Sequence, residues 1–187
     1  MRIVAGSHRG RRLETPADDR IRPTSDRIRE SLFNILGHRL DGGFIGKRVL
    51  DGFAGTGALG LEALSRGAAS ALFIDRNREA LALCRRNAAT LGFAKQTDVR
   101  LADLTHAGLA TGSFDLVFLD PPYGEGLAAK ALAAIHAAGW LAPAAIVVVE
   151  ADRAQPENIP EGFSVIDSRD YGRTRIVLVA REATDNS

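Results

Sequence analysis

From residue 47 onward, short apolar runs alternate with longer segments in which apolar residues recur every three or four positions. Such short runs predict strands and the periodic segments predict helices. Strands are expected at 48–53, 69–75, 98–101, 114–119, 145–150, 163–168 and 174–180, and helices at 58–65, 78–91 and 127–138. This alternation predicts an α/β fold, a mainly parallel sheet with helices on both faces. Only residues 169–173 separate the last two strands, so they are expected to form a hairpin in which one strand runs antiparallel.

The first 46 residues follow a different pattern. Residues 1–15 alternate weakly around the glycines of 6–10, which predicts a short hairpin. After an extended lead at 20–23, a helix capped by Thr24 or Ser25 is expected. Its apolar positions have helical spacing: Ile28, Leu32, Ile35 and Leu36. Its remaining faces are expected to carry Arg27, Arg29 and Glu30.

The bulk composition indicates one soluble domain over residues 1–187. The chain has 187 residues, of which 45% are hydrophobic, enough for a sizeable core. No run approaches the roughly 20 apolar residues that span a bilayer, and the N-terminus lacks the apolar block of a signal peptide. We therefore expect a cytoplasmic protein without a membrane partner.

The single cysteine, Cys84, lies among leucines in a helical pattern. We expect it to be a buried structural thiol, with a reactive thiol as the alternative. The four histidines are scattered without the spacing of metal ligands, so no metal site is expected: His8, His38, His106 and His136.

Charge is distributed unevenly along the chain. Residues 1–40 contain nine arginines and five acidic residues, a net charge of +4, whereas the whole chain carries +1. The guanidinium of arginine forms bidentate hydrogen bonds with phosphate and stacks on bases, so this basic extension predicts a contact with nucleic acid. A solvated basic face is the alternative. The candidate RNA-binding residues are Arg9, Arg11, Arg12, Arg22 and Arg27.

A glycine-rich turn follows the first strand of the alternating region. Its glycines at 55, 57 and 60 fit the dinucleotide fingerprint, which alone is weak evidence. Asp75 ends the next strand, where a carboxylate can accept the hydroxyls of a ribose, so an adenosine ligand is expected. Asp51 beside the turn would repel a pyrophosphate and attract an ammonium or sulfonium group. S-adenosylmethionine is therefore favoured over a nicotinamide dinucleotide.

Asp103 ends the third strand, where it could accept a hydrogen bond from the adenine amino group. Capping of a following turn is the alternative for this residue. The expected cofactor-binding residues are Asp51, Gly52, Phe53, Ala54, Gly55, Thr56, Gly57, Asp75, Arg76, Asp103 and Leu104.

The tetrapeptide Asp120, Pro121, Pro122 and Tyr123 follows the apolar run 114–119, at the strand end where ligands of α/β sheets gather. The exocyclic amine of a nucleobase is a poor nucleophile because its lone pair is delocalised into the ring. The Asp120 carboxylate and the Pro121 carbonyl could each accept one N–H and direct the lone pair toward a methyl group. The prolines make the turn rigid, and Tyr123 offers a face on which an extruded base can stack. Methyl transfer to a base nitrogen is thus the predicted chemistry, and all four residues are candidates for the catalytic site.

Together, residues 51–57, Asp75, Asp103 and 120–123 resemble the class I S-adenosylmethionine-dependent methyltransferases that methylate nitrogen through an Asp/Asn-Pro-Pro-Tyr/Phe loop. Segments 2–6, 9–13, 22–34 and 57–68 resemble the bacterial 16S rRNA guanine-N2 methyltransferases of the small ribosomal subunit. The likeness extends through Glu150 and weakens beyond it. One departure is Gly52, where the family usually has a larger residue.

The resemblance implies a Rossmann-like, seven-stranded, mostly parallel sheet with one antiparallel strand and a hairpin and helix extension at the N-terminus. It implies a monomer that uses S-adenosylmethionine to methylate a guanine of 16S rRNA, on an assembled or assembling small subunit. The alternatives are an adenine-N6 methyltransferase acting on DNA or RNA and a noncatalytic rRNA-binding assembly factor. A protein-glutamine methyltransferase is disfavoured by Asp120, where asparagine is expected. A nicotinamide oxidoreductase is disfavoured by Asp51.

Overall fold

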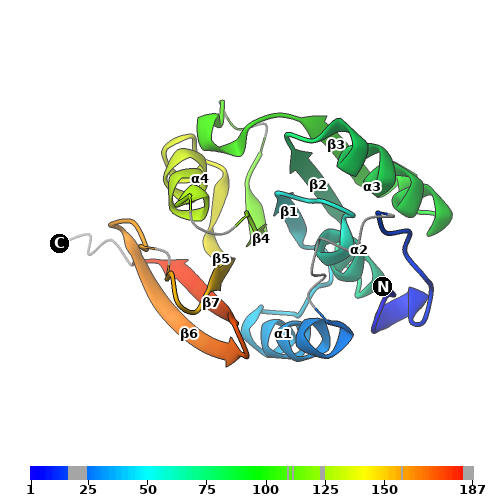
Figure 1. The fold of residues 1–187 in the computed structure, drawn as a ribbon, viewed down its shortest axis with the longest axis horizontal. Helices are drawn as coiled ribbons and strands as arrows, with labels where there is room; N and C mark the ends of the chain where they lie inside the picture. The colour runs from blue at the N-terminus through cyan, green and yellow to red at the C-terminus, as the bar shows by residue number, and fades with distance from the viewer. Residues whose placement is uncertain (17–24, 109, 111, 123–124, 157, 183–187) are drawn as a thin grey trace. The chain divides into compact units, whose positions relative to one another are not determined.

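The computed structural model describes residues 1–16, 25–108, 110, 112–122, 125–156 and 158–182. The chain forms two compact units, Met1–Asp103 and Leu104–Ser187. In Figure 1 the first unit is coloured from blue to green and the second from green to red.

Three parallel strands in the order β3-β2-β1 form the sheet of the first unit. Its elements are α1 (Asp26–Arg39), β1 (Arg48–Gly52), α2 (Ala58–Ser65), β2 (Ser70–Asp75), α3 (Arg78–Thr90), a 3-10 turn (Ala94–Gln96) and β3 (Thr97–Leu101). Phe73 in the central strand pairs with Asp51 on one side and Val99 on the other, and its side chain is fully buried. The predicted alternation of strands and helices is confirmed, with bounds that differ by one residue at most in this unit.

The N-terminal segment forms less of a hairpin than its sequence pattern predicts. One antiparallel bridge joins Arg2 to Arg12, and a 3-10 turn, Gly6–His8, lies between them. Ile3 and Leu13 are buried, so the segment packs against its unit rather than extending into solvent. We call residues 1–14 the N-terminal arm.

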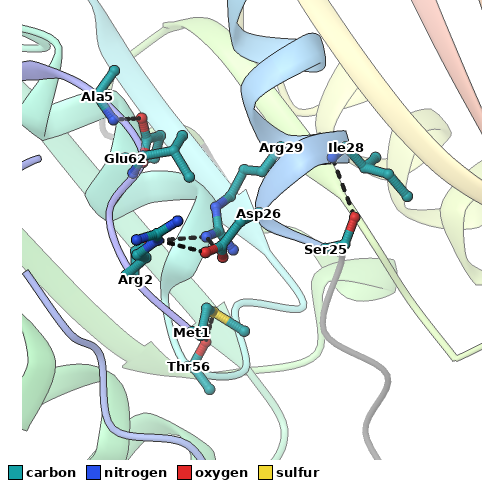
Figure 2. A network of polar contacts seen from close by, with 10 residues as sticks. Met1, Arg2, Ala5, Ser25, Asp26, Ile28, Arg29, Thr56 and Glu62 are labelled. Atoms are coloured by element: carbon teal, nitrogen blue, oxygen red, sulfur yellow. Dashed lines mark hydrogen bonds and ion pairs between the residues drawn. The ribbon is translucent and has the colours of Figure 1, made fainter. Parts of the chain in front are cut away.

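Helix α1 begins as predicted, because the Ser25 side chain accepts a hydrogen bond from the backbone N–H of Ile28. The prediction that Arg29 lies on a polar face is wrong, since its side chain is only 1% exposed. Its Nη2 donates to the backbone oxygen of Arg2 and to Oδ1 of Asp26. Burial lowers the pKa of the Arg29 guanidinium, and the charges of Asp26 and Glu62 oppose that shift. Arg29 therefore fastens the arm to α1 (Figure 2).

Four strands in the order β4-β5-β7-β6 form the sheet of the second unit. Its elements are a 3-10 turn (Leu104–His106), β4 (Phe114–Leu119), α4 (Leu127–Ala137), β5 (Leu141–Asp152), β6 (Phe163–Tyr171) and β7 (Thr174–Arg181). Strands β4 and β5 are parallel, while β7 is antiparallel to both β5 and β6. The predicted hairpin with one antiparallel strand is confirmed.

Strands β5 and β6 are longer than predicted. Strand β7 pairs with β5 as far as Asp152 and with β6 as far as Tyr171, so only residues 172–173 are left to turn the chain. Asp170, expected in the connecting loop, instead accepts hydrogen bonds from Arg175 directly across the strands. Charged residues interrupt the apolar pattern by which a strand is predicted. Here a cross-strand ion pair allows such residues to lie within two paired strands.

Candidate functional site

The loop at residues 53–57, here called the glycine loop, turns the chain sharply between β1 and α2. Phe53, Gly55 and Gly57 have φ angles of 66°, 54° and 79°. The backbone N–H of Ala54 donates to Ile74 at 2.9 Å, which fastens the loop to the end of β2. A positive φ at a residue other than glycine costs about 1–2 kcal/mol, and such strain concentrates at functional sites. Phe53 therefore adds a structural reason to regard this loop as a binding site.

Close packing beneath the loop explains the glycines at 57 and 60. A Cβ on Gly57 would lie 2.6 Å from Sγ of Cys84, and one on Gly60 would lie 2.4 Å from the Phe73 ring. Helix α2 can thus approach β2 and α3 only without side chains at these positions. Cys84 is a free buried thiol whose pKa is raised by burial, in agreement with the predicted structural role.

Asp51, at the end of β1, is 2% exposed. Its Oδ2 accepts a hydrogen bond of 2.8 Å from the backbone N–H of Gly60. Burial raises the pKa of Asp51 to about 7, and the charge of Asp75 adds to the shift. A buried carboxylate with a raised pKa is a candidate functional group, and a cationic ligand would favour its ionised form.

Asp75, at the end of β2, is joined directly to the glycine loop. Its Oδ2 accepts from the backbone N–H of Gly55 at 2.9 Å, and its Oδ1 accepts from Asn77 at 2.8 Å. A carboxylate offers about four acceptor positions, so Asp75 keeps capacity for the hydroxyls of a ribose. The structure thus brings Asp51, Asp75 and the glycine loop together at the carboxyl ends of two paired strands.

The remaining predicted cofactor residues lie at two different places. Arg76 and Asp103 form an ion pair of 3.7 Å on the surface of the first unit. Leu104 begins the second unit in a 3-10 turn and is buried.

Asn87 was not identified from the sequence, although it joins the glycine loop to the N-terminal arm. It lies inside α3 and is 2% exposed. Its Oδ1 accepts from the backbone N–H of Glu14 at 2.8 Å, while its Nδ2 donates to the oxygens of Glu14 at 3.1 Å and Thr56 at 3.0 Å. The signal that could have indicated it is an amide at helical spacing from the apolar residues Leu83 and Cys84.

Glu62 and Ser65 bind the arm to α2. The fully buried carboxylate of Glu62 accepts the backbone N–H groups of Val4 and Ala5 at 2.8 and 3.0 Å. Ser65 donates to the oxygen of Ala5 at 2.7 Å and accepts from the N–H of His8 at 3.0 Å. Figure 2 shows Glu62 against Ala5, with Arg2 and Asp26 paired nearby.

The structure describes four of the five predicted RNA-binding arginines. Arg9, Arg11, Arg12 and Arg27 have exposed side chains. Arg11 also reaches the backbone oxygen of Thr90 at 3.4 Å. Arg22 lies outside the described residues.

The predicted catalytic motif begins directly after β4 in the second unit. Every β4 residue from Leu116 to Leu119 is buried, which confirms the predicted buried strand. Asp120 is half-buried, Pro121 is buried and Pro122 is exposed, while Tyr123 lies outside the described residues. The motif thus begins where a buried strand leaves the core.

In the part of the chain that the structure describes, no group of histidine, cysteine and acidic residues could bind a metal ion. Nor does any helix there have the length and apolar character needed to cross a bilayer. His8 and His136 instead pack edge-on against Phe93 and Phe163.

A family model described as "Conserved hypothetical protein 95" matches residues 1–180. The "Ribosomal RNA small subunit methyltransferase D" of Escherichia coli strain K12 is 36% identical over 191 residues, which covers 100% of this chain and 93% of that protein. The protein of the same name from Haemophilus influenzae is 35% identical over 176 residues, or 92% of this chain and 89% of that protein. The chain belongs to this family of rRNA methyltransferases.

The solved structure named "Putative methyltransferase yhhF from Escherichia coli" has the same fold, with a TM-score of 0.83 and 34% identity over 98% of this chain and 99% of that one. The predicted Rossmann-like class I methyltransferase fold is confirmed. The described residues include seven strands, and β7 runs antiparallel to its neighbours β5 and β6. Family membership also confirms the prediction of an S-adenosylmethionine-dependent methyltransferase.

Proposed function

We propose that this protein transfers a methyl group from S-adenosylmethionine to the N2 amino group of a guanine in 16S rRNA. The substrate would be the small ribosomal subunit or an assembly intermediate of it, in the cytoplasm, and the protein would act as a monomer. The observation that carries the proposal is the Asp120-Pro121 pair of acceptors at the end of a buried strand, in a chain whose relatives bear the name of a small-subunit rRNA methyltransferase.

The fit of the first unit to the methyl donor rests on two carboxylates beside the glycine loop. Asp51 is buried and supplies negative charge, which suits the ammonium and sulfonium groups. Asp75 fixes the loop through Gly55 and has acceptor capacity for ribose hydroxyls. When bound, S-adenosylmethionine supplies an electrophilic methyl group on a positively charged sulfur.

Asp120 and Pro121 act on the acceptor amine. The carboxylate of Asp120 accepts one N–H and the carbonyl of Pro121 accepts the other, which moves the nitrogen toward a tetrahedral geometry and localises its lone pair. As the N–C bond formed, the bond between that carbon and the donor's sulfur would break and S-adenosylhomocysteine would be the leaving group. The nitrogen would become positively charged, the negative charge of Asp120 would stabilise that transition state, and the surplus N–H proton would pass to the carboxylate and on to solvent. Tyr123 would stack on the extruded base.

Replacement of Asp120 with Ala tests this mechanism. We expect the variant to bind S-adenosylmethionine within a few-fold of the original affinity, since all the proposed donor contacts except Leu104 lie in the first unit. Incorporation of a tritiated methyl group into small subunits from cells that lack this gene should be abolished. Full activity of Asp120→Ala would exclude the proposed role.

Asp120→Asn is the matched control for charge. It retains an oxygen that can accept the amine N–H but loses the carboxylate charge, so activity between those of the original protein and Asp120→Ala is expected. Activity of Asp120→Asn equal to that of the original protein would show that the charge plays no part.

The target base is tested by mapping methylated positions on 16S rRNA from cells with and without the gene. Loss of one N2-methylguanine supports the proposal. Loss of an N6-methyladenine would favour the adenine alternative, and unchanged methylation with defective subunits would favour the noncatalytic assembly factor.

A further inference from the structure

The side chain of Asn87 contacts both the glycine loop and the N-terminal arm. Its two N–H groups are divided between them, one donating to Thr56 in the loop and the other to Glu14 in the arm. Its oxygen accepts the backbone N–H of Glu14. The amide orientation is determined by its partners, because a flipped amide would oppose oxygen to the Thr56 carbonyl and N–H to the Glu14 N–H.

Burial makes the two contacts of this amide interdependent. Asn87 is 2% exposed, so an N–H that loses its protein partner is not readily compensated by solvent. Displacement of Thr56 leaves the amide with an unpaired donor and less firmly placed for Glu14, and displacement of Glu14 has the reverse effect. A second contact also joins the glycine loop to the arm, because Oγ1 of Thr56 lies 3.8 Å from Sδ of Met1 (Figure 2).

We propose that Asn87 is a positioning residue that makes the order of the arm depend on donor binding in the glycine loop. A bound donor holds the glycine loop in place, and with it the Thr56 carbonyl. That carbonyl then orients the Asn87 amide, and the amide in turn holds Glu14 and the arm. This inference rests on the proposed function, which assigns the glycine loop to the donor, and on the predicted contact between the arginines of the arm and rRNA. It predicts that the donor binds first and that rRNA then meets an ordered arm.

Hydrogen exchange on the full chain tests the inference without any RNA. The probe is S-adenosylhomocysteine, which occupies the donor site without reacting. In the original protein we expect saturating probe to slow exchange of the backbone N–H groups of Leu13 and Glu14 at least about fivefold, the lower end of typical coupling factors. These N–H groups bind Met1 and Asn87 and so report on the order of the arm.

The variant Asn87→Ala should lose this protection while it still binds the probe. Asn87→Asp is a second variant, which keeps an acceptor for the Glu14 N–H but has no N–H for Thr56, and it should lose the protection as well. A residue with a purely structural role would change the basal exchange rates and leave the response to the probe intact.

Ser65→Ala is the matched control, because Ser65 binds the arm through Ala5 and His8 without a contact to the glycine loop. It should speed basal exchange of the His8 N–H and retain the protection of Glu14 by the probe. Unchanged exchange of Leu13 and Glu14 in the original protein with bound probe would overturn the inference. Failure of the probe to bind at all would overturn the proposed donor site, and the inference with it.

Discussion

Asp51 combines a cost to folding with a proposed gain in donor binding. Its pKa is raised by burial to about 7, so between pH 4 and 7 the folded chain holds more protons at this site than the unfolded chain. The stability that this residue contributes is therefore present at low pH and is lost as the pH rises through about 7. Each unit of pKa shift corresponds to about 1.36 kcal/mol, so the buried charge costs a few kcal/mol above neutral pH.

Affinity for S-adenosylmethionine should depend on pH through the same group. Because the cationic donor favours the ionised carboxylate, affinity should rise about tenfold from pH 6 to pH 8, in proportion to the ionised fraction of Asp51. Calorimetric titration at several pH values measures this effect. Asp51→Asn should bind S-adenosylmethionine more weakly at pH 8. The pH dependence of affinity that remains in this variant measures the contribution of the donor's own amino group.

The stability of Asp51→Asn provides an independent check. The amide retains an oxygen for the Gly60 N–H, so at pH 8 the variant should resist urea better than the original protein. Equal stability at pH 8 would contradict a buried charge at this position.

Among the elements, α2 connects the glycine loop to the N-terminal arm. Its N-terminal end follows the glycine loop, Glu62 and Ser65 on it bind the arm, and its glycine at 60 lies against the Phe73 ring. The spacing between helix and strand is fixed by the absence of a side chain at that position. Any change there should alter both stability and the position of Asp51, since Gly60 donates to its carboxylate.

Gly60→Ala should destabilise the protein by about 1–3 kcal/mol, the usual cost of overpacking a core. Its new methyl group would lie 2.4 Å from the ring of Phe73 and 3.2 Å from Oδ2 of Asp51. Chemical denaturation measures the loss, and S-adenosylmethionine affinity should fall as well.

Gly37→Ala in α1 is the matched control, because its methyl group would meet Phe44 at an ordinary 3.6 Å. With no clash, the better helix propensity of alanine should stabilise the protein by up to about 1 kcal/mol. Similar changes in stability for the two substitutions would show that the close packing at Gly60 does not determine the effect of a methyl group there.

For the whole molecule, local signals in the sequence predict the elements well. The bounds of α2 and β4 were predicted at both ends, because a glycine turn precedes the helix and a turn signal follows the apolar strand. The placement of Asp51 and Asp75 near the ends of two strands beside the glycine loop was also predictable, although their binding of the donor stays a prediction.

Long-range pairing is what the sequence did not reveal. Glu62 and Asn87 bind backbone groups 58 and 73 residues away, and nothing local marks a polar residue whose partner is a distant amide. Arg29 was misplaced for the same reason, because its buried position depends on the oxygen of Arg2. The extra length of β5 and β6 likewise depends on β7.

The proposed contact between the arm and rRNA is tested by binding measurements on the whole molecule. Simultaneous replacement of Arg9, Arg11 and Arg12 with Ala should weaken binding of 16S rRNA and reduce the slope of log K against log salt by about one for each arginine that contacts a phosphate. Filter binding over a range of salt concentrations measures both quantities.

The control is a variant with Arg100, Arg153 and Arg169 replaced with Ala, which removes the same charge from exposed positions outside the arm. It should leave the slope nearly unchanged. Equal losses in the two triple variants would indicate a net-charge effect and remove the arm from the interface.

The buried carboxylate of Glu62 also limits how the arm can be studied. Deleting the first eight residues would remove the N–H groups of Val4 and Ala5, leaving this side chain with Arg66 and without its two amide donors. A buried charge that loses partners costs several kcal/mol, so a truncated protein would be damaged in its core as well as shortened. Point substitutions at the exposed arginines separate RNA affinity from fold integrity, and deletion does not.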